Sequence, residues 1–220
     1  MIYAMSDFHL PSSLNKDMNM FGWGNHVEKI KDNWSLTDND TIIMPGDLSW
    51  ALKENELVCD LELIESLKGK KILLKGNHDY WWNSKNKLKE ILKPYPSIQF
   101  IQYGSLEVEG ICICGTRGWD IKANTDEDKK HIEREAGRLR ASILSSTNNN
   151  KIVFMHYPPI YKDFDFDLYL NIFKEYEIKK VYYGHLHGNA IDDAIQGVYD
   201  GIEFKCIAAD QIDFTPIKIV

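Results

Sequence analysis

Five short blocks of potential metal ligands occur in order along the chain. They are DFH at 7–9, GD at 46–47, GNHD at 76–79, a histidine after an apolar run at 156, and GHLH at 184–187. Only two of the chain's seven histidines, His26 and His131, fall outside these blocks. Imidazole nitrogens and carboxylate or amide oxygens suit divalent first-row metals. This concentration of ligands predicts one metal centre.

The number and type of these side chains indicate what kind of centre it is. The candidate ligands are Asp7, His9, Asp47, Asn77, His156, His185 and His187. Seven side chains are too many for one tetrahedral ion and suit two ions that share a bridging ligand. The two residues of an i, i+2 pair face the same side of an extended chain, so Asp7 and His9 can point into one cleft, as can His185 and His187. The set lacks the cysteine pairs of a zinc finger, which favours an open catalytic site.

Each block follows a predicted strand. Apolar runs at 1–7, 41–45, 71–74, 151–155 and 181–183 read as strands that end at ligand positions. Apolar residues at helical spacing fall between them, as in 57–67. Alternating strands and helices are typical of an α/β fold, and open α/β sheets place their sites beyond the carboxyl ends of the strands. We therefore expect the blocks to meet at one edge.

The middle and the end of the chain have a different pattern. Short strands separated by tight turns are expected at 98–103, 106–108 and 111–114, which predicts antiparallel hairpins. A long amphipathic helix follows, with Thr125 as its cap. The segments 203–208 and 216–220 read as closing antiparallel strands. No repeat or linker interrupts the chain, so we expect a single domain over residues 1–220.

The composition of the chain limits which substrates and which cellular compartment are expected. With 220 residues and a net charge of −7, the chain lacks the basic surface that long nucleic acids require, whereas a small phosphorylated substrate is compatible with a metal centre. No apolar run approaches the ~18 residues of a membrane span. The four cysteines form no CxxC pair, which favours a reducing compartment. Asp7 lies so near the start that a cleaved leader would remove it, which argues against a signal peptide. We expect a cytoplasmic protein with no membrane partner. The sequence carries no pattern that predicts its oligomeric state.

The ordered blocks resemble those of the calcineurin-like metallophosphoesterase superfamily, whose pattern is DxH, GD, GNH followed by an acid, H and GHxH. The match extends from residue 7 to residue 187. Single blocks arise by chance, but the whole set in this order is specific. The resemblance implies a two-sheet β-sandwich flanked by helices, with a dinuclear metal site at the carboxyl ends of the strands. One ion would be held by Asp7, His9 and His187, the other by Asn77, His156 and His185, and Asp47 would bridge both.

The resemblance also implies a mechanism. A hydroxide held between two divalent ions would attack phosphorus in line, and His78 would protonate the leaving group as general acid. Asp79 would orient the His78 ring through a hydrogen bond. Mn, Fe, Zn, Co and Ni all accept this mixed ligand set.

The departures from the family pattern concern the substrate. Protein Ser/Thr phosphatases of this superfamily carry GDxVDRG, where this chain has Trp50 and Ala51 and lacks the phosphate-gripping arginine. The sequence is more similar to the small bacterial members. Arg117, between glycines after a predicted strand, is a candidate replacement for the phosphate contact. Four tryptophans near the blocks form either an aromatic rim or core packing: Trp50, Trp81, Trp82 and Trp119. Residues 20–25 form either a lid or an ordinary surface loop.

The function predicted from the sequence is hydrolysis of a small phosphomonoester or phosphodiester, with the diester favoured. One alternative is a non-catalytic scaffold of the same fold, which the retained His78 argues against because scaffolding needs no acid. The other is a nuclease, which the acidic composition disfavours.

Overall fold

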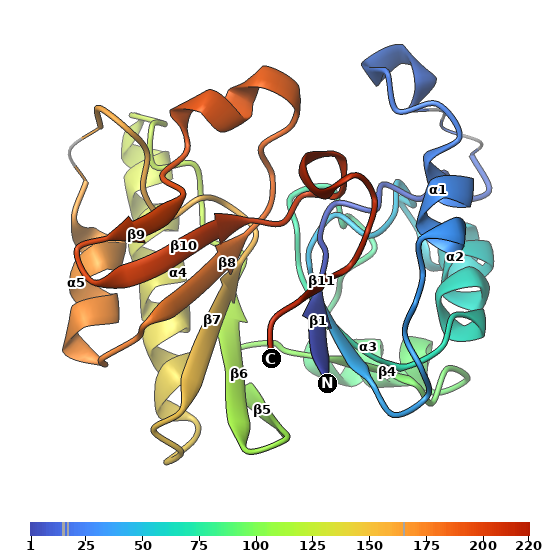
Figure 1. Cartoon of the computed structure of the whole chain (residues 1–220), viewed down its shortest axis with the longest axis horizontal. Helices are drawn as coiled ribbons and strands as arrows, with labels where there is room; N and C mark the ends of the chain where they lie inside the picture. Colours follow the sequence, from blue (N-terminus) through green and yellow to red (C-terminus); the bar gives the residue numbers. More distant parts are fainter. Residues whose placement is uncertain (15, 17, 165) are drawn as a thin grey trace.

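Two β-sheets packed face to face, with helices on their outer sides, make up the described part of the chain (Figure 1). The computed structural model describes residues 1–14, 16, 18–164 and 166–220. The predicted α/β class and the two-sheet sandwich flanked by helices are confirmed. In the described residues, no helix is both long and apolar enough to span a membrane.

The first sheet comes mainly from the N-terminal half and has the strand order β11-β1-β2-β3-β4. Its strands are β1 (Ile2–Ala4), β2 (Thr41–Pro45), β3 (Lys70–Leu74), β4 (Ile98–Phe100) and β11 (Ile217–Lys218). β1 to β4 pair in parallel, and β11 returns antiparallel to β1. The carboxyl ends of the parallel strands therefore lie at one edge.

The second sheet has the order β5-β6-β7-β8-β10-β9. Its strands are β5 (Ser105–Val108), β6 (Ile111–Thr116), β7 (Lys151–Met155), β8 (Lys180–Tyr183), β9 (Gly197–Tyr199) and β10 (Ile202–Cys206). β6, β7, β8 and β10 are parallel, whereas β5 and β9 are antiparallel edge strands.

Helices cover the outer face of each sheet, and Figure 1 shows α1 and α2 on one side of the molecule and α4 and α5 on the other. The α-helices are α1 (His26–Asp32), α2 (Glu54–Ser66), α3 (Lys85–Leu92), α4 (Asp126–Leu144) and α5 (Leu168–Glu175). Short 3₁₀ turns are η1 (Asn19–Phe21), η2 (Gly188–Asp193) and η3 (Ala209–Ile212). Thr125 caps α4 as predicted, because its side chain accepts the Asp128 backbone N–H and Asp128 reciprocates.

Buried apolar side chains divide into layers that match this architecture. One cluster, including Ile43, Ile113 and Phe154, fills the space between the sheets. A second joins the first sheet to its helices, and a third joins the second sheet to α4 and α5. Both faces of the central strands are thus buried, which explains why β2 and β6 are continuous apolar runs.

Two expectations about the topology were wrong. The middle segment does not form consecutive hairpins, because only β5 and β6 pair antiparallel, while β4 joins the first sheet in parallel with β3. The 203–208 segment forms β10, which lies parallel to β8 and antiparallel only to β9. Strand direction depends on long-range pairing that short apolar runs do not specify.

Candidate metal centre

All seven candidate ligands lie beyond the carboxyl ends of parallel strands. They follow β1 (Asp7 and His9), β2 (Asp47), β3 (Asn77), β7 (His156) and β8 (His185 and His187). β1, β2 and β3 are neighbours in the first sheet, and β7 and β8 are neighbours in the second. The site therefore combines loops from both sheets.

Among the described residues, two overlapping groups of side chains could each hold a metal ion. Asp7, His9 and His187 form one, and Asp7, Asp47 and His156 form the other, with ligand atoms within 4.8 Å of one another. The first matches a set implied by the family resemblance. The second shares Asp7 with it, whereas the resemblance gave the shared position to Asp47.

The two oxygens of Asp7 have different surroundings. Oδ2 accepts hydrogen bonds from the Ser6 hydroxyl at 2.5 Å and the His185 backbone N–H at 3.0 Å. Oδ1 is buried and has no hydrogen-bond partner in the described part of the chain. It lies 3.5 Å from His187 Nε2 and 3.9 Å from His9 Nε2. One oxygen thus fixes the carboxylate, and the other faces ring nitrogens across a space that a cation fits.

Asp47 is held in the same manner. Its Oδ1 accepts the backbone N–H of His78 at 2.8 Å. Its Oδ2 lies 3.7 Å from His9 Nε2 and 3.5 Å from His156 Nε2, and so faces a histidine of each group. This position suits a ligand that contacts two ions.

Asn77 joins the second group to His185. Its Oδ1 lies 2.6 Å from His156 Nε2 and 2.9 Å from His185 Nδ1. Three side chains from three loops therefore converge on one point, as expected of the second ligand set.

Several of these residues adopt a strained backbone. Asp7, His9, Asp47 and His185 have φ of +59°, +42°, +51° and +71°. Non-glycine residues in this left-handed region cost about 1–3 kcal/mol each and concentrate at functional sites. The expected extended DxH and HxH segments are therefore wrong, because Asp7, His9 and His185 have a left-handed backbone conformation. The candidate ligands still converge, through left-handed backbone conformations rather than through the alternation of an extended strand.

Glycines allow the ligand loops to approach one another closely. A Cβ on Gly76 would lie 2.1 Å from Asp47 Oδ1, and one on Gly184 would lie 2.2 Å from Asp7 Oδ2. Such contacts are impossible for any other residue, which explains why glycine directly precedes Asn77 and His185.

The electrostatics of the buried cluster favour a bound cation. Burial and the charge of Asp7 raise the pKa of Asp47 to about 8. Burial lowers the pKa of His9 and of His185 to about 3, so both rings are neutral at neutral pH and can act as ligands. Divalent cations would stabilise both carboxylates in their charged form. The orphaned Asp7 Oδ1, the paired carboxylates and the neutral imidazoles therefore fit the divalent ions that the family pattern implies.

His78 lies against the ligands without belonging to either group. Its ring centroid is 4.5 Å from that of Trp50 and 5.7 Å from that of His9. It lines a cavity of about 530 Å³ together with His9, Asp47, His185 and His187. Burial and the nearby His156 lower the pKa of His78 to about 4. A bound anion would counter this shift, because negative charge favours the imidazolium.

The predicted hydrogen bond between Asp79 and the His78 ring is not formed. Asp79 is fully buried and accepts backbone N–H groups of Gly76, Asp47 and Leu48 at 2.7–3.0 Å. It also accepts the Trp81 indole N–H at 3.1 Å. His78 Nδ1 has no hydrogen-bond partner among the residues described. Asp79 therefore positions the loop that carries Asp47 rather than the His78 ring.

Asp210, which the sequence motifs did not identify, contacts one candidate ligand directly. It lies in η3, and its Oδ1 is 2.8 Å from His187 Nδ1 while its Oδ2 accepts the Gly188 backbone N–H at 2.9 Å. Burial opposes protonation of His187, but the contacts with Asp210 and Asp7 raise its pKa to about 10. A carboxylate on the far ring nitrogen fixes the orientation of a ligand histidine. Asp210 lies 23 residues from His187 in a segment without a ligand motif, so the sequence carried no signal for it.

Asp210→Asn is expected to weaken metal binding about 10- to 100-fold, because the carboxylate that orients His187 is lost. Metal titration followed by calorimetry measures the effect. Asp213→Asn, an exposed aspartate in the same segment, is the matched control and should bind metal like the wild type. Equal affinity in the two variants would show that Asp210 does not support the site.

Aromatic side chains form one wall of the cavity. Trp50 stacks on His9 with centroids 4.9 Å apart, and Trp23 lies edge-on to His9 and His187 at 5.6 and 5.1 Å. Phe21 and Trp23, from the predicted lid or surface loop, line the cavity, and Phe21 is 60% exposed. Of the four tryptophans considered in the sequence, Trp50 lines this cavity, and Trp81 and Trp82 are buried in the core. Trp119 lines a different cavity, described below.

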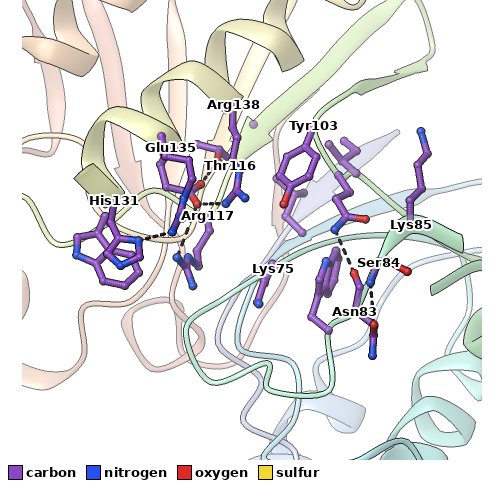
Figure 2. A pocket seen from close by; sticks show the side chains of 17 residues that line it. Lys75, Asn83, Ser84, Lys85, Tyr103, Thr116, Arg117, His131, Glu135 and Arg138 are labelled. Atoms are coloured by element: carbon purple, nitrogen blue, oxygen red, sulfur yellow. Dashed lines mark hydrogen bonds and ion pairs between the residues drawn. The ribbon is translucent and has the colours of Figure 1, made fainter. Parts of the chain in front are cut away.

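Arg117 lies outside the cavity of the metal ligands. Its backbone oxygen accepts the N–H groups of His156 and Tyr157 at 3.2 and 2.9 Å, but its side chain lines a neighbouring cavity (Figure 2). There its guanidinium lies over the Trp119 ring and 3.7 Å from Glu135. Arg117 is thus adjacent to the ligand loops but does not face the ligands themselves.

Residues 1–189 match the family model described as calcineurin-like phosphoesterase. The chain belongs to this family. Members use divalent metals to hydrolyse phosphoesters, and the Asp and His groups above are of the type that binds such metals. Comparison with curated proteins gave no match.

Solved structures share the fold at low sequence identity. A protein of unknown function from Aquifex aeolicus is 20% identical with a TM-score of 0.53, covering 99% of this chain and 94% of its own. Phosphopantetheinyl hydrolase from Mycobacterium tuberculosis is 14% identical with a TM-score of 0.58, covering 100% and 96%. The protein TT1561 from Thermus thermophilus is 13% identical with a TM-score of 0.57, covering 98% and 96%. These similarities extend over nearly the whole chain and concern the fold alone.

Proposed function

We propose that this protein is a dinuclear metal-dependent phosphoesterase that hydrolyses a small phosphodiester, with His78 as general acid. The observation that carries the proposal is the convergence of seven ligand side chains beside a cavity that His78 also lines. Two divalent ions there would supply Lewis acidity towards the phosphoryl oxygens and an activated water. The cavity volume of about 530 Å³ is typical of a small-molecule site.

The lining of the cavity favours a diester over a monoester. Among the described residues, no lysine or arginine lines it, and apolar side chains such as Trp23, Trp50 and Phe214 do. A monoester dianion carries more charge to be neutralised, whereas a diester carries one charge and a second organic group. The aromatic wall offers that group a flat apolar surface.

Other residues of the chain would position the ligands, donate a proton and exclude water. Asp79 and the turn around Gly46 fix the position of Asp47, and Asp210 fixes His187. His78, half-buried against Trp50, would donate a proton to the leaving oxygen once the anionic substrate has raised its pKa. The aromatic wall would exclude water from the leaving group.

Turnover of bis-p-nitrophenyl phosphate and of p-nitrophenyl phosphate, with Mn²⁺ added, tests the proposal. We expect metal-dependent hydrolysis of both, with a higher kcat/KM for the diester. A preference for the monoester would instead establish a phosphatase. No metal-dependent turnover of either ester, in a protein that binds metal, would support the scaffold function.

A further inference from the structure

A second cavity, of about 710 Å³, adjoins the metal centre and is rich in positive charge (Figure 2). Its charged lining residues are Lys75, Lys85, Arg117, Arg134, Arg138 and Glu135. Five cations thus face one carboxylate, in a protein whose net charge is −7. We call this the cationic cavity. Such a local excess of positive charge attracts anions.

The cationic cavity is connected to the metal centre through two lining residues that adjoin the ligand loops. Lys75 follows β3 and is two residues before Asn77, and Arg117 follows β6 and accepts the backbone N–H of His156. The cavity therefore lies at the same edge of the two sheets, at the carboxyl ends of β3, β4 and β6. Lys75 and Arg117 therefore join the cationic cavity to the loops that carry Asn77 and His156.

The arginines are held in place, and part of their donor capacity is unused. Glu135, whose side chain is 2% exposed, pairs with Arg138 and lies 3.7 Å from Arg117. It also accepts the Thr116 hydroxyl. The Arg117 Nε is buried and has no hydrogen-bond partner in the described part of the chain. The buried Glu135 carboxylate thus holds two guanidinium groups side by side, and some of their N–H donors stay available for a ligand.

Lys75 also has hydrogen-bond donors that the described residues do not use. Its ammonium group makes no hydrogen bond or ion pair with the described residues. A bound anion would relieve the repulsion among these cations. The N-terminus of α3, at Ser84 and Lys85, also lines the cavity and adds the positive end of its helix dipole.

We propose that the cationic cavity binds a second phosphate of the substrate, so that the enzyme acts on a small phosphodiester with an additional phosphate away from the scissile bond. The inference rests on the proposed function, because the metal centre must cleave the diester. It assigns Lys75, Arg117 and Arg138 to the distal phosphate. Arg117 is then not a replacement for the arginine that contacts the scissile phosphate in protein phosphatases. Arginine and lysine donors give charge-assisted hydrogen bonds to phosphate oxygens.

Two chromogenic diesters with the same leaving group test the inference. They are the p-nitrophenyl esters of thymidine 5′-phosphate with a free 3′-hydroxyl and with a 3′-phosphate. We expect kcat/KM to be about tenfold higher for the 3′-phosphorylated ester, the effect of one charge-assisted hydrogen bond. Lys75→Gln and Arg138→Gln should bring the ratio of the two kcat/KM values close to one.

Lys129→Gln is the matched control, since Lys129 lies on α4 with Arg138 but is 60% exposed and pairs only with Asp126 in the structure described. It should keep the wild-type ratio. A wild-type ratio near one, or a ratio that Lys75→Gln and Arg138→Gln leave unchanged, would overturn the inference.

Calorimetry with pyrophosphate separates this inference from the proposed function. Lys75→Gln and Arg138→Gln should weaken pyrophosphate binding about tenfold relative to Lys129→Gln, whether or not the protein cleaves either ester. Equal binding by all three variants would reject the cationic cavity as an anion site. If the protein cleaves neither ester but binds pyrophosphate more weakly after Lys75→Gln, only the proposed phosphodiesterase function would be rejected.

Discussion

Asp47→Asn is expected to lower metal-dependent turnover at least about 100-fold and to lower the metal content of the protein. Loss of outer carboxylates that merely orient ligands already costs about 10- to 100-fold, and Asp47 faces the metal groups directly. Its Oδ2 lies within 3.7 Å of both His9 Nε2 and His156 Nε2. An amide would remove the negative charge that two neighbouring cations require. Turnover of bis-p-nitrophenyl phosphate and elemental analysis measure the two effects.

Asp60→Asn is the matched control for this substitution. Asp60 is also a buried carboxylate, 3% exposed, but it hydrogen-bonds Ser49 and the Ser12 backbone and does not line the cavity. Asp60 accepts the Ser12 backbone N–H and the Ser49 hydroxyl, and an amide can keep both contacts by accepting the first and donating to the second. This variant should keep its metal and its activity. Wild-type metal content in Asp47→Asn would contradict the role of Asp47 as a shared ligand.

His78→Gln is expected to slow turnover by about 10² to 10⁴ for esters with poor leaving groups, while the metal stays bound. His78 lines the cavity but belongs to neither ligand group, so its loss removes a proton donor and no ligand. The loss should shrink as the leaving group becomes more acidic, because p-nitrophenolate needs little protonation. Rates for a series of phenyl and alkyl esters of one phosphate measure this dependence.

The slope of rate against leaving-group pKa serves as the internal control. A general acid flattens this slope in the wild type, and its loss steepens the slope in the variant. A uniform rate loss across the series would assign His78 to substrate binding or positioning. Loss of metal from His78→Gln would mean that His78 acts as a ligand.

The convergence of the candidate ligands could be predicted from the sequence because each block combines ligand-type residues with the end of an apolar strand. Asp47 and His156 are examples, since the β2 and β7 runs before them are buried strands that pair in parallel with both neighbours. The parallel arrangement then brings their carboxyl ends together. The fold class followed from the same pattern. Asp210 could not be found this way, because its contact with His187 depends on how the chain returns after β10.

The partner of Asp79 and the direction of β4 could not be predicted for related reasons. The family resemblance implied that Asp79 orients the His78 ring, but the backbone at 76–79 directs the Asp79 carboxylate towards the backbone N–H groups of Asp47 and Leu48. β4 precedes a genuine hairpin, yet it pairs with β3 in the other sheet. In both cases the outcome depends on backbone geometry and long-range pairing, which residue types do not determine.

The metal content of the protein tests the central claim most directly. The protein would be loaded with Mn²⁺, freed of unbound metal by gel filtration and measured by elemental analysis. Two ions per chain are predicted, since Asp7, His9 and His187 form one group and Asp47 and His156 belong to the other. One ion per chain, or none, would contradict a dinuclear phosphoesterase.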